Sequence, residues 1–402
     1  MKKGESAMNK EDFISEIMQI DVVDTHSHLI GDRLAAKDFW QIGEYFWLLL
    51  ELQAGGYPKD PAQLSEEKRI EAYIKAFNST RNTAMNWVVR ETFKNLYDID
   101  IKDEKSIRLA DEAVRSTALQ PDWAQKVADS LSIKKVVVNN PEHMDFKNLP
   151  NTSVFIPRID GLLNQWTKKV FESEKQADVM AEVSGEMEKL LADCGIRGCK
   201  GIMTTLRPFA LRTYGNGTSL KRSGNTKDEI TVALLHELCK SAEKHNLFIQ
   251  FFLGVEHGWS SNTGAPVNDP NRILNLHGLF DQYHCKFELV VATEINTMDV
   301  VQAARLFPNV HAGGLWWFTF RPSIFMECMQ RRFEALPPSS SSLIVSDARC
   351  IEWCYGKTLL IKKLVADYLY EQVQAGWVDR NEALRIAREW LYESAASRYG
   401  IE

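Results

Sequence analysis

The sequence lacks any apolar run of about 18 residues, the length at which a membrane-spanning helix is expected. It also lacks a surplus of basic residues, since 48 Lys and Arg stand against 54 Asp and Glu and give a net charge of −6. Nucleic acid is therefore not an expected partner, because its phosphates need cationic side chains to neutralise them. A small anionic substrate fits this composition, because it needs only a local Arg or Lys.

Cysteine motifs are sparse as well. The seven cysteines include no CxxC pair, and the opening residues, MKKGESAMNKEDF, contain no apolar segment of the kind found in secretory signals. An odd number of cysteines in a chain of 402 residues is typical of free thiols in a reducing compartment. We therefore expect a cytoplasmic protein without a membrane span.

Short apolar runs rich in β-branched residues alternate with helical patterns along most of the chain. Such runs, bounded by turn residues, are typical of parallel strands that are buried on both faces. The strand-like runs are 20–24, 133–138, 153–157, 197–203, 247–255, 287–292, 309–313 and 343–345. Eight strands with intervening helices, such as those at 178–193 and 228–244, predict an α/β fold of the (β/α)8 TIM-barrel type.

Two regions exceed a minimal barrel. Residues 30–117 carry helical patterns and aromatic residues but no convincing strand, which indicates a helical insertion after the first strand. Residues 357–402 carry further helical stripes and indicate a C-terminal helical extension. We expect both regions to pack on the barrel, so that 1–402 forms a single domain.

The strongest local motif is the pair His26 and His28, directly after the first strand. Residues i and i+2 of a strand point the same way, so both imidazoles should project at the carboxyl end of the barrel, where such folds keep their active sites. Asp347 follows the eighth strand, which neighbours the first in a closed barrel. These three side chains suit Zn²⁺ or another divalent transition metal. The alternatives are ordinary polar strand ends and, for Asp347, a helix cap or an ion pair with Arg349.

Longer segments extend this pattern over nearly the whole chain. They are DTHSHL at 24–29, VVNNP at 137–141, PRIDGLLN at 157–164, EKHNLFIQFFLGV at 243–255, GGLWWF at 313–318 and SDAR at 346–349. With these motifs in this order, the chain resembles the amidohydrolase superfamily, and within it the shorter bacterial branch of the uronate (glucuronate) isomerase family. That family interconverts the aldose and ketose forms of a hexuronate, for example D-glucuronate and D-fructuronate.

The resemblance implies one divalent metal, zinc or a transition metal such as manganese, held by His26, His28 and Asp347. It also implies acid–base chemistry at Asp347 and a catalytic and substrate-binding role for Arg349. Such roles are chemically reasonable, because an Arg binds a carboxylate through two hydrogen bonds and a carboxylate can accept a substrate proton. The alternative for Arg349 is a cap on the following helix.

The same resemblance places three further residues in the substrate pocket, with Arg158 binding the sugar acid and Trp316 shaping the pocket wall. His257, in the loop after the fifth strand, is a third substrate-binding candidate. The alternatives are a structural ion pair for Arg158 and a solvent-facing position for His257. The implied partner is a small anionic sugar acid, and assembly into a homo-oligomer is left open.

The chain departs from the family at one important pair. Family members carry a His-Tyr pair in the insertion, and an ungapped reading places that pair on Leu49 and Leu50. Two other functions therefore stay open: a metal-dependent hydrolase or lyase acting on another small carboxylated or carbohydrate substrate, and a catalytically silent relative that binds a sugar acid. Lys200, expected near the end of the fourth strand, is a further candidate for contact with metal or substrate.

Overall fold

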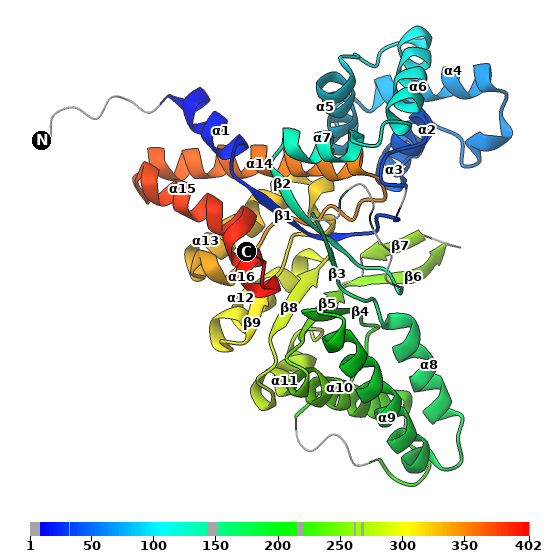
Figure 1. The fold of residues 1–402 in the computed structure, drawn as a ribbon, viewed down its shortest axis with the longest axis vertical. Helices are drawn as coiled ribbons and strands as arrows, with labels where there is room; N and C mark the ends of the chain where they lie inside the picture. Colours follow the sequence, from blue (N-terminus) through cyan, green and yellow to red (C-terminus); the bar gives the residue numbers. More distant parts are fainter. Residues whose placement is uncertain are drawn as a thin grey trace, which may run out of the picture.

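The computed structural model describes residues 9–401, except residue 32 and the segments 143–145, 147–148, 150–151, 215–219, 261–262 and 267–268. The side chains of 256–260 and 263–266 are likewise outside the description. The chain forms an α/β structure built on two parallel sheets, one of three strands in the order β1-β2-β3 and one of four in the order β4-β5-β8-β9 (Figure 1). The strands are β1 (Val22–Ser27), β2 (Ile133–Val138), β3 (Ser153–Phe155), β4 (Gly201–Thr205), β5 (Phe248–Leu253), β8 (Phe287–Val291) and β9 (Val310–Ala312). An antiparallel hairpin of β6 (Val255–Ser260) and β7 (Thr263–Pro266) follows β5 directly.

Main-chain hydrogen bonds connect the two sheets at both edges. After β3, the chain pairs with β4, where the amide of Met203 donates to the carbonyl of Pro157 at 2.9 Å. At the other edge, the amide of Ser342 donates to the carbonyl of Ala312 in β9 at 3.0 Å. The strands thus form a continuous hydrogen-bonded succession from β1 to the segment that follows β9.

The segment 341–348 lies between β9 and β1, where the eighth strand was predicted. It contains no regular strand and pairs only through isolated bridges, among them Ser27 with Ala348. The amide of Asp347 donates to the carbonyl of His26 at 2.9 Å, which ties the segment to β1. Asp347 itself adopts a left-handed conformation with φ of 53°, and this turn interrupts the extended backbone.

Helices of the region between β1 and β2 gather at the upper right of Figure 1. They are α2 (Phe39–Gly43), α3 (Phe46–Ala54), α4 (Glu66–Ser79), α5 (Ala84–Tyr97), α6 (Glu104–Ala118) and α7 (Trp123–Ser130). Five of these helices, α2 to α6, lie within or almost wholly within the region 30–117, for which helical patterns were predicted.

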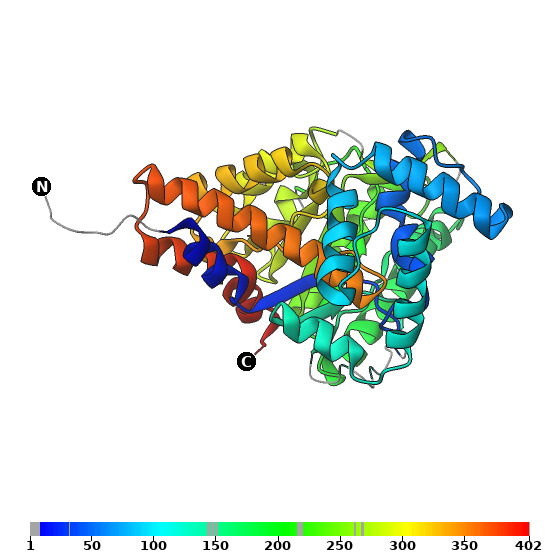
Figure 2. The ribbon, with the colours of Figure 1, turned by 90° about the horizontal axis from the view of Figure 1, so that it is seen from above.

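A buried carboxylate fastens this region to α14 (Ile351–Gln374), the long helix that follows the barrel strands. Glu352, in the first turn of α14, is fully buried and accepts hydrogen bonds from the amide of Ala36 at 2.9 Å and from the indole of Trp123 at 2.9 Å. Gly356, one turn later, packs directly against α5, where an added Cβ would lie 2.5 Å from the hydroxyl of Thr92. Figure 2 shows α14 (orange) running from beside the first helix (blue) to these insertion helices.

The remaining helices surround the strands. They are α1 (Lys10–Met18), α8 (Asp160–Phe171), α9 (Gln176–Ile196), α10 (Lys227–Lys244), α11 (His277–Gln282), α12 (Thr297–Leu306), α13 (Pro322–Ala335), α15 (Arg380–Arg388) and α16 (Ser394–Tyr399). Short 3-10 or π turns occur at Pro61–Gln63, Leu274–Leu276, Glu294–Asn296, Trp317–Phe320, Pro338–Ser340 and Glu389–Glu393. Among the described helices, none is both long enough and apolar enough to cross a membrane.

Candidate metal centre and pocket

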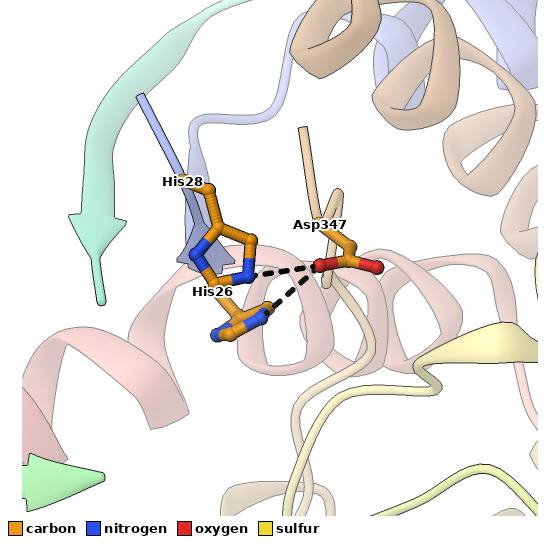
Figure 3. A group of neighbouring side chains, drawn as sticks. All are labelled: His26, His28 and Asp347. Atoms are coloured by element: carbon orange, nitrogen blue, oxygen red, sulfur yellow. Dashed lines mark ion pairs between the residues drawn. The ribbon is translucent and has the colours of Figure 1, made fainter. Parts of the chain in front are cut away.

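His26 of β1, His28 directly after β1 and Asp347 after β9 converge at one point (Figure 3). The Nε2 atoms of His26 and His28 lie 3.3 Å and 3.2 Å from the same carboxylate oxygen, Oδ1 of Asp347. All three candidate ligand atoms lie within 4.8 Å of one another. The sequence prediction that these residues come together is in accord with this geometry.

The other imidazole nitrogens face oxygen acceptors on one residue, Asn139, which directly follows β2. The Nδ1 of His26 lies 2.7 Å from the side-chain oxygen of Asn139, and the Nδ1 of His28 lies 3.1 Å from its backbone carbonyl. Because each acceptor is an oxygen, each Nδ1 must carry the hydrogen, and each Nε2 keeps its lone pair. A hydrogen bond at the far nitrogen is the usual way in which proteins orient metal-binding histidines.

The electrostatics of the cluster favour the protonation states that bind metals. Burial lowers the pKa of His26 to about 4, so its imidazole is neutral at pH 7. Burial acts to raise the pKa of Asp347, but the neighbouring imidazoles of His26 and His28 outweigh it and hold that pKa well below its usual value. The Nε2 atoms of the two imidazoles and the Asp347 carboxylate form a donor set for Zn²⁺ or Mn²⁺, and the buried Nε2 of His26 has no hydrogen-bond partner among the described residues. The residues therefore fit a divalent metal.

The cluster lies in the wall of a cavity of about 1550 Å³. The predicted pocket residues Arg158, Trp316 and Arg349 line it together with Arg207. Helices of the insertion supply another part of the wall. Their lining residues include Trp40, Gln41, Glu44, Tyr45, Phe46, Trp47, Leu49 and Arg69.

The two arginines singled out from the sequence differ in their surroundings. Arg158 forms a two-pronged ion pair with Asp160 at the start of α8, with Nε–Oδ1 at 2.5 Å and Nη2–Oδ2 at 3.0 Å. Arg349 is exposed and forms no ion pair within the described part of the chain. Among the described residues, the guanidinium of Arg349 therefore has no carboxylate partner that an incoming anion would have to displace, whereas Arg158 already holds one.

Trp316 and its neighbour Trp317 both reach the cavity but pack against different parts of the protein. The ring of Trp316 lies edge-on to Phe252 of β5 at 4.7 Å and to His26 at 6.3 Å. The ring of Trp317 packs against Trp47 of α3 at 4.3 Å, on the side of the insertion. Trp316 thus borders the metal cluster, and Trp317 joins the barrel to the insertion.

Four other residues were singled out from the sequence, and their positions differ. Lys200 was expected near the end of the fourth strand, but β4 begins at Gly201, so Lys200 lies at the amino end, opposite the metal cluster, and is exposed. The fourth strand was predicted at 197–203, but the glycine-rich residues before Gly201 are not part of β4. His257 lies in β6, and its side chain falls outside the described residues. Leu49 lines the cavity, whereas Leu50 is 40% exposed and is not among the lining residues.

Two further residues take part in the site, and the sequence analysis missed one of them, Asn139. Tyr45 is buried, and its hydroxyl donates a hydrogen bond to the backbone carbonyl of Asp347. Asn139 orients both histidines, as described above. The position of Asn139 immediately after a buried strand was a usable signal, because His28 and Asp347 had been found by the same rule.

No protein-family model matches the sequence, and no curated protein matches it. Solved structures do match over almost the whole chain. A uronate isomerase from Thermotoga maritima superposes with a TM-score of 0.80 at 16% identity and covers 99% of this chain and 100% of its own. A uronate isomerase from Bacillus halodurans gives 0.76 at 18% identity, covering 99% and 98%. A glucuronate isomerase from Caulobacter crescentus gives 0.77 at 13% identity, covering 98% and 94%. The chain therefore shares the TIM-barrel-type fold of the uronate and glucuronate isomerases, which confirms the predicted resemblance at the level of the fold.

Proposed function

We propose that this chain is a metal-dependent isomerase that interconverts the aldose and ketose forms of a sugar acid, with a hexuronate such as D-glucuronate as substrate. The observation that carries the proposal is the cluster of His26, His28 and Asp347 at a cavity, in a chain that superposes on uronate isomerases over nearly its full length. We further propose that the strands and the segment 341–348 close into one eight-stranded barrel. Residues 30–117 and 357–402 then belong to the same domain, in a cytoplasmic protein.

A divalent metal held by His26, His28 and Asp347 would polarise the substrate carbonyl and lower the barrier to removing a proton from the adjacent carbon. Asp347 is ionised at neutral pH, because the two imidazoles keep its pKa low. Its carboxylate can therefore accept a proton from a substrate hydroxyl.

The carboxylate of a uronate needs a cationic partner in the pocket. Arg349 is the better candidate, since it lines the cavity without an ion pair among the described residues. A guanidinium binds a carboxylate through two parallel hydrogen bonds, which fixes orientation as well as charge. In this proposal Arg158, held by Asp160, contributes to the shape of the pocket, together with Trp316.

Leu49 and Leu50 favour a second candidate function. Neither side chain can transfer a proton, so the residues that family members use at this place are missing. The hydroxyl of Tyr45 lies nearby, but burial raises its pKa well above the ordinary value and its proton is donated to a backbone carbonyl. A hydrolase or lyase reaction on another small carboxylated substrate would need only the metal cluster and Asp347.

One experiment separates the two candidates. The purified protein is analysed for bound metal and incubated with D-glucuronate or D-galacturonate in D2O, and the reaction is followed by proton NMR. Formation of the ketose with deuterium uptake at the carbon next to the carbonyl supports the isomerase. Bound metal without turnover rejects the isomerase and favours the hydrolase or lyase. Absence of metal, with His26→Ala leaving ligand binding unchanged, would indicate a catalytically silent binding protein.

A further inference from the structure

A line of buried polar side chains runs from the metal cluster through the interior of the strands to the helix α16. His26 contacts Asn139, and the amide nitrogen of Asn139 lies 3.4 Å from the side-chain oxygen of Gln250 in β5. The amide nitrogen of Gln250 lies 3.0 Å from the hydroxyl of Tyr399, which donates to Glu288 of β8 at 2.7 Å. All five residues are at most 1% exposed. The interiors of such barrels are usually filled with branched apolar side chains. This line of polar side chains is therefore unusual, and we ask what function it has.

Backbone carbonyls fix the orientation of the two amide side chains in the line. The amide of Asn139 also faces the carbonyl of Ile156 at 3.3 Å, and the amide of Gln250 also faces the carbonyl of Thr25 at 3.1 Å. A carbonyl only accepts, so the NH2 group of each side chain is identified and its oxygen must point toward the preceding member. His26 therefore donates to Asn139, Asn139 to Gln250, and Gln250 to the hydroxyl of Tyr399.

The far end of the line is set by Glu288. The hydroxyl of Tyr399 has one hydrogen, and with the oxygen already accepting from Gln250 that hydrogen goes to the carboxylate. Burial raises the pKa of Glu288, and the guanidinium groups of Arg398 and Arg332 oppose that rise. The hydroxyl of Tyr399 thus donates to Glu288 and not to Gln250, so the donors along the line all point away from His26.

We propose that Asn139, Gln250, Tyr399 and Glu288 together hold His26 in the tautomer that carries its hydrogen on Nδ1, so that Tyr399 and Gln250 act as positioning residues for the metal centre. Reversing the tautomer would leave the Nδ1 lone pair facing the oxygen of Asn139. Rotating the Asn139 amide to compensate would place its oxygen against the carbonyl of Ile156. Gln250, whose amide donates to the hydroxyl of Tyr399, thus acts with the carbonyl of Ile156 to keep the Asn139 amide in this orientation.

The consequence for metal affinity rests on the proposed metal site, whereas the tautomer of His26 can be tested without metal. Protein labelled with ¹⁵N-histidine and free of metal is examined by long-range ¹H–¹⁵N NMR, with the His26 signals assigned by their loss in His26→Gln. The variants are Gln250→Leu and Tyr399→Phe. The matched control is Tyr368→Phe, because the hydroxyl of Tyr368 is buried without a hydrogen-bond partner among the described residues. Zinc affinity of each protein is then measured by chelator competition.

We expect the Nδ1-protonated form in the parent protein and a mixture of tautomers in both variants. Loss of such orienting partners typically weakens metal binding by about 10-fold to 100-fold, and we expect Gln250→Leu to fall in that range with Tyr399→Phe between it and the parent. Unchanged His26 signals in both variants, with melting temperatures near that of the parent, would overturn the inference. A change of the His26 signals in Tyr368→Phe as large as that in the two variants would also overturn the inference. If the parent binds no zinc, the metal proposal fails, and the tautomer signals still decide this inference.

Discussion

The hydroxyl of Tyr45, at the start of α3, donates a hydrogen bond to the backbone carbonyl of Asp347, 302 positions away in sequence. Asp347 has a φ of 53°, a left-handed conformation that is uncommon for a residue with a side chain. The ring of Tyr45 is in turn packed against Trp353 of α14 at 4.5 Å. The insertion therefore helps to hold the turn that aims the Asp347 carboxylate at the two histidines.

Replacing Tyr45 by Phe should disturb this turn. We expect Tyr45→Phe to lower zinc affinity by about 10-fold, as for other partners that orient metal ligands. Loss of the hydrogen bond should also reduce the free energy of unfolding by about 1 to 2 kcal/mol. Calorimetric titration and urea denaturation measure the two quantities. Tyr73→Phe is the control, since the Tyr73 hydroxyl is buried in the same insertion without a partner among the described residues, and equal losses in both variants would contradict the prediction.

Arg349 should dominate recognition of a substrate carboxylate. Removing a charge-assisted pair of hydrogen bonds costs about 1.5 to 3 kcal/mol, so we expect Arg349→Met to raise the KM for a uronate by about 10-fold to 100-fold. Asp160→Asn, which releases Arg158 from its ion pair, should leave the KM unchanged or lower it. Steady-state kinetics on the two variants provide the test, and an unchanged KM for Arg349→Met would reject the assignment.

Lys357 of α14 should make stability depend on alkaline pH. It is fully buried with the rings of Tyr45, Trp47 and Phe320 within 6 Å, and burial lowers its pKa to about 8. Between this value and 10.5 the unfolded chain binds more protons at Lys357 than the folded protein does, so the contribution of this group to stability rises with pH.

Lys357→Met should therefore be more stable than the parent near pH 7, with the difference shrinking by about 3 kcal/mol as the pH rises from 8 to 10.5. Urea denaturation of both metal-free proteins across this range measures the difference, in which other titrating groups cancel. A difference that does not change with pH would show that Lys357 keeps its proton throughout.

Two helical glycines should respond to alanine with opposite signs. At Gly356 an added Cβ would lie 2.5 Å from Thr92 and 2.6 Å from Val88, so Gly356→Ala should destabilise the protein by about 1 to 2 kcal/mol through overpacking. Gly185 of α9 has nothing within 4 Å of the same position, so Gly185→Ala should stabilise it by about 1 kcal/mol through helix propensity. Thermal melts of the two variants and the parent measure these changes in stability. A Gly356→Ala variant that is more stable than the parent would contradict the close packing of α14 on α5.

Features carried by local pattern were predictable from the sequence. The second strand was predicted at 133–138, the range that β2 occupies, because its apolar run is bounded clearly on both sides. His26, His28 and Asp347 could be brought together because the ends of neighbouring parallel strands meet at one edge. The eighth strand, predicted at 343–345, is not a regular strand, because these residues are connected to their neighbours only by single main-chain bonds, such as that from the amide of Thr25 to the carbonyl of Ile344 at 3.2 Å. An apolar run does not reveal how completely a segment pairs.

Features that depend on the direction of a side chain or on contacts between distant residues were not predictable in this way. The pairing of Arg158 with Asp160 involves residues only two apart, and it was left as an alternative because sequence does not say where a guanidinium turns. Gln250 and Tyr399 are separated by 149 positions, and nothing near either residue signals their hydrogen bond. The role of Tyr45 likewise depends on how the insertion sits over the strands.

The fastening of the insertion by Glu352 bears on the speed of substrate exchange. A fully buried carboxylate that accepts from Ala36 and Trp123 leaves two donors without partners if the insertion lifts away, and Gly356 keeps α14 and α5 in direct contact. We therefore expect this wall of the cavity to stay in place during ligand exchange. We expect the association rate of a sugar acid to depend on solvent viscosity and ionic strength, as for diffusion into a pocket that is always open. We expect no slow kinetic phase of the kind that lid opening produces.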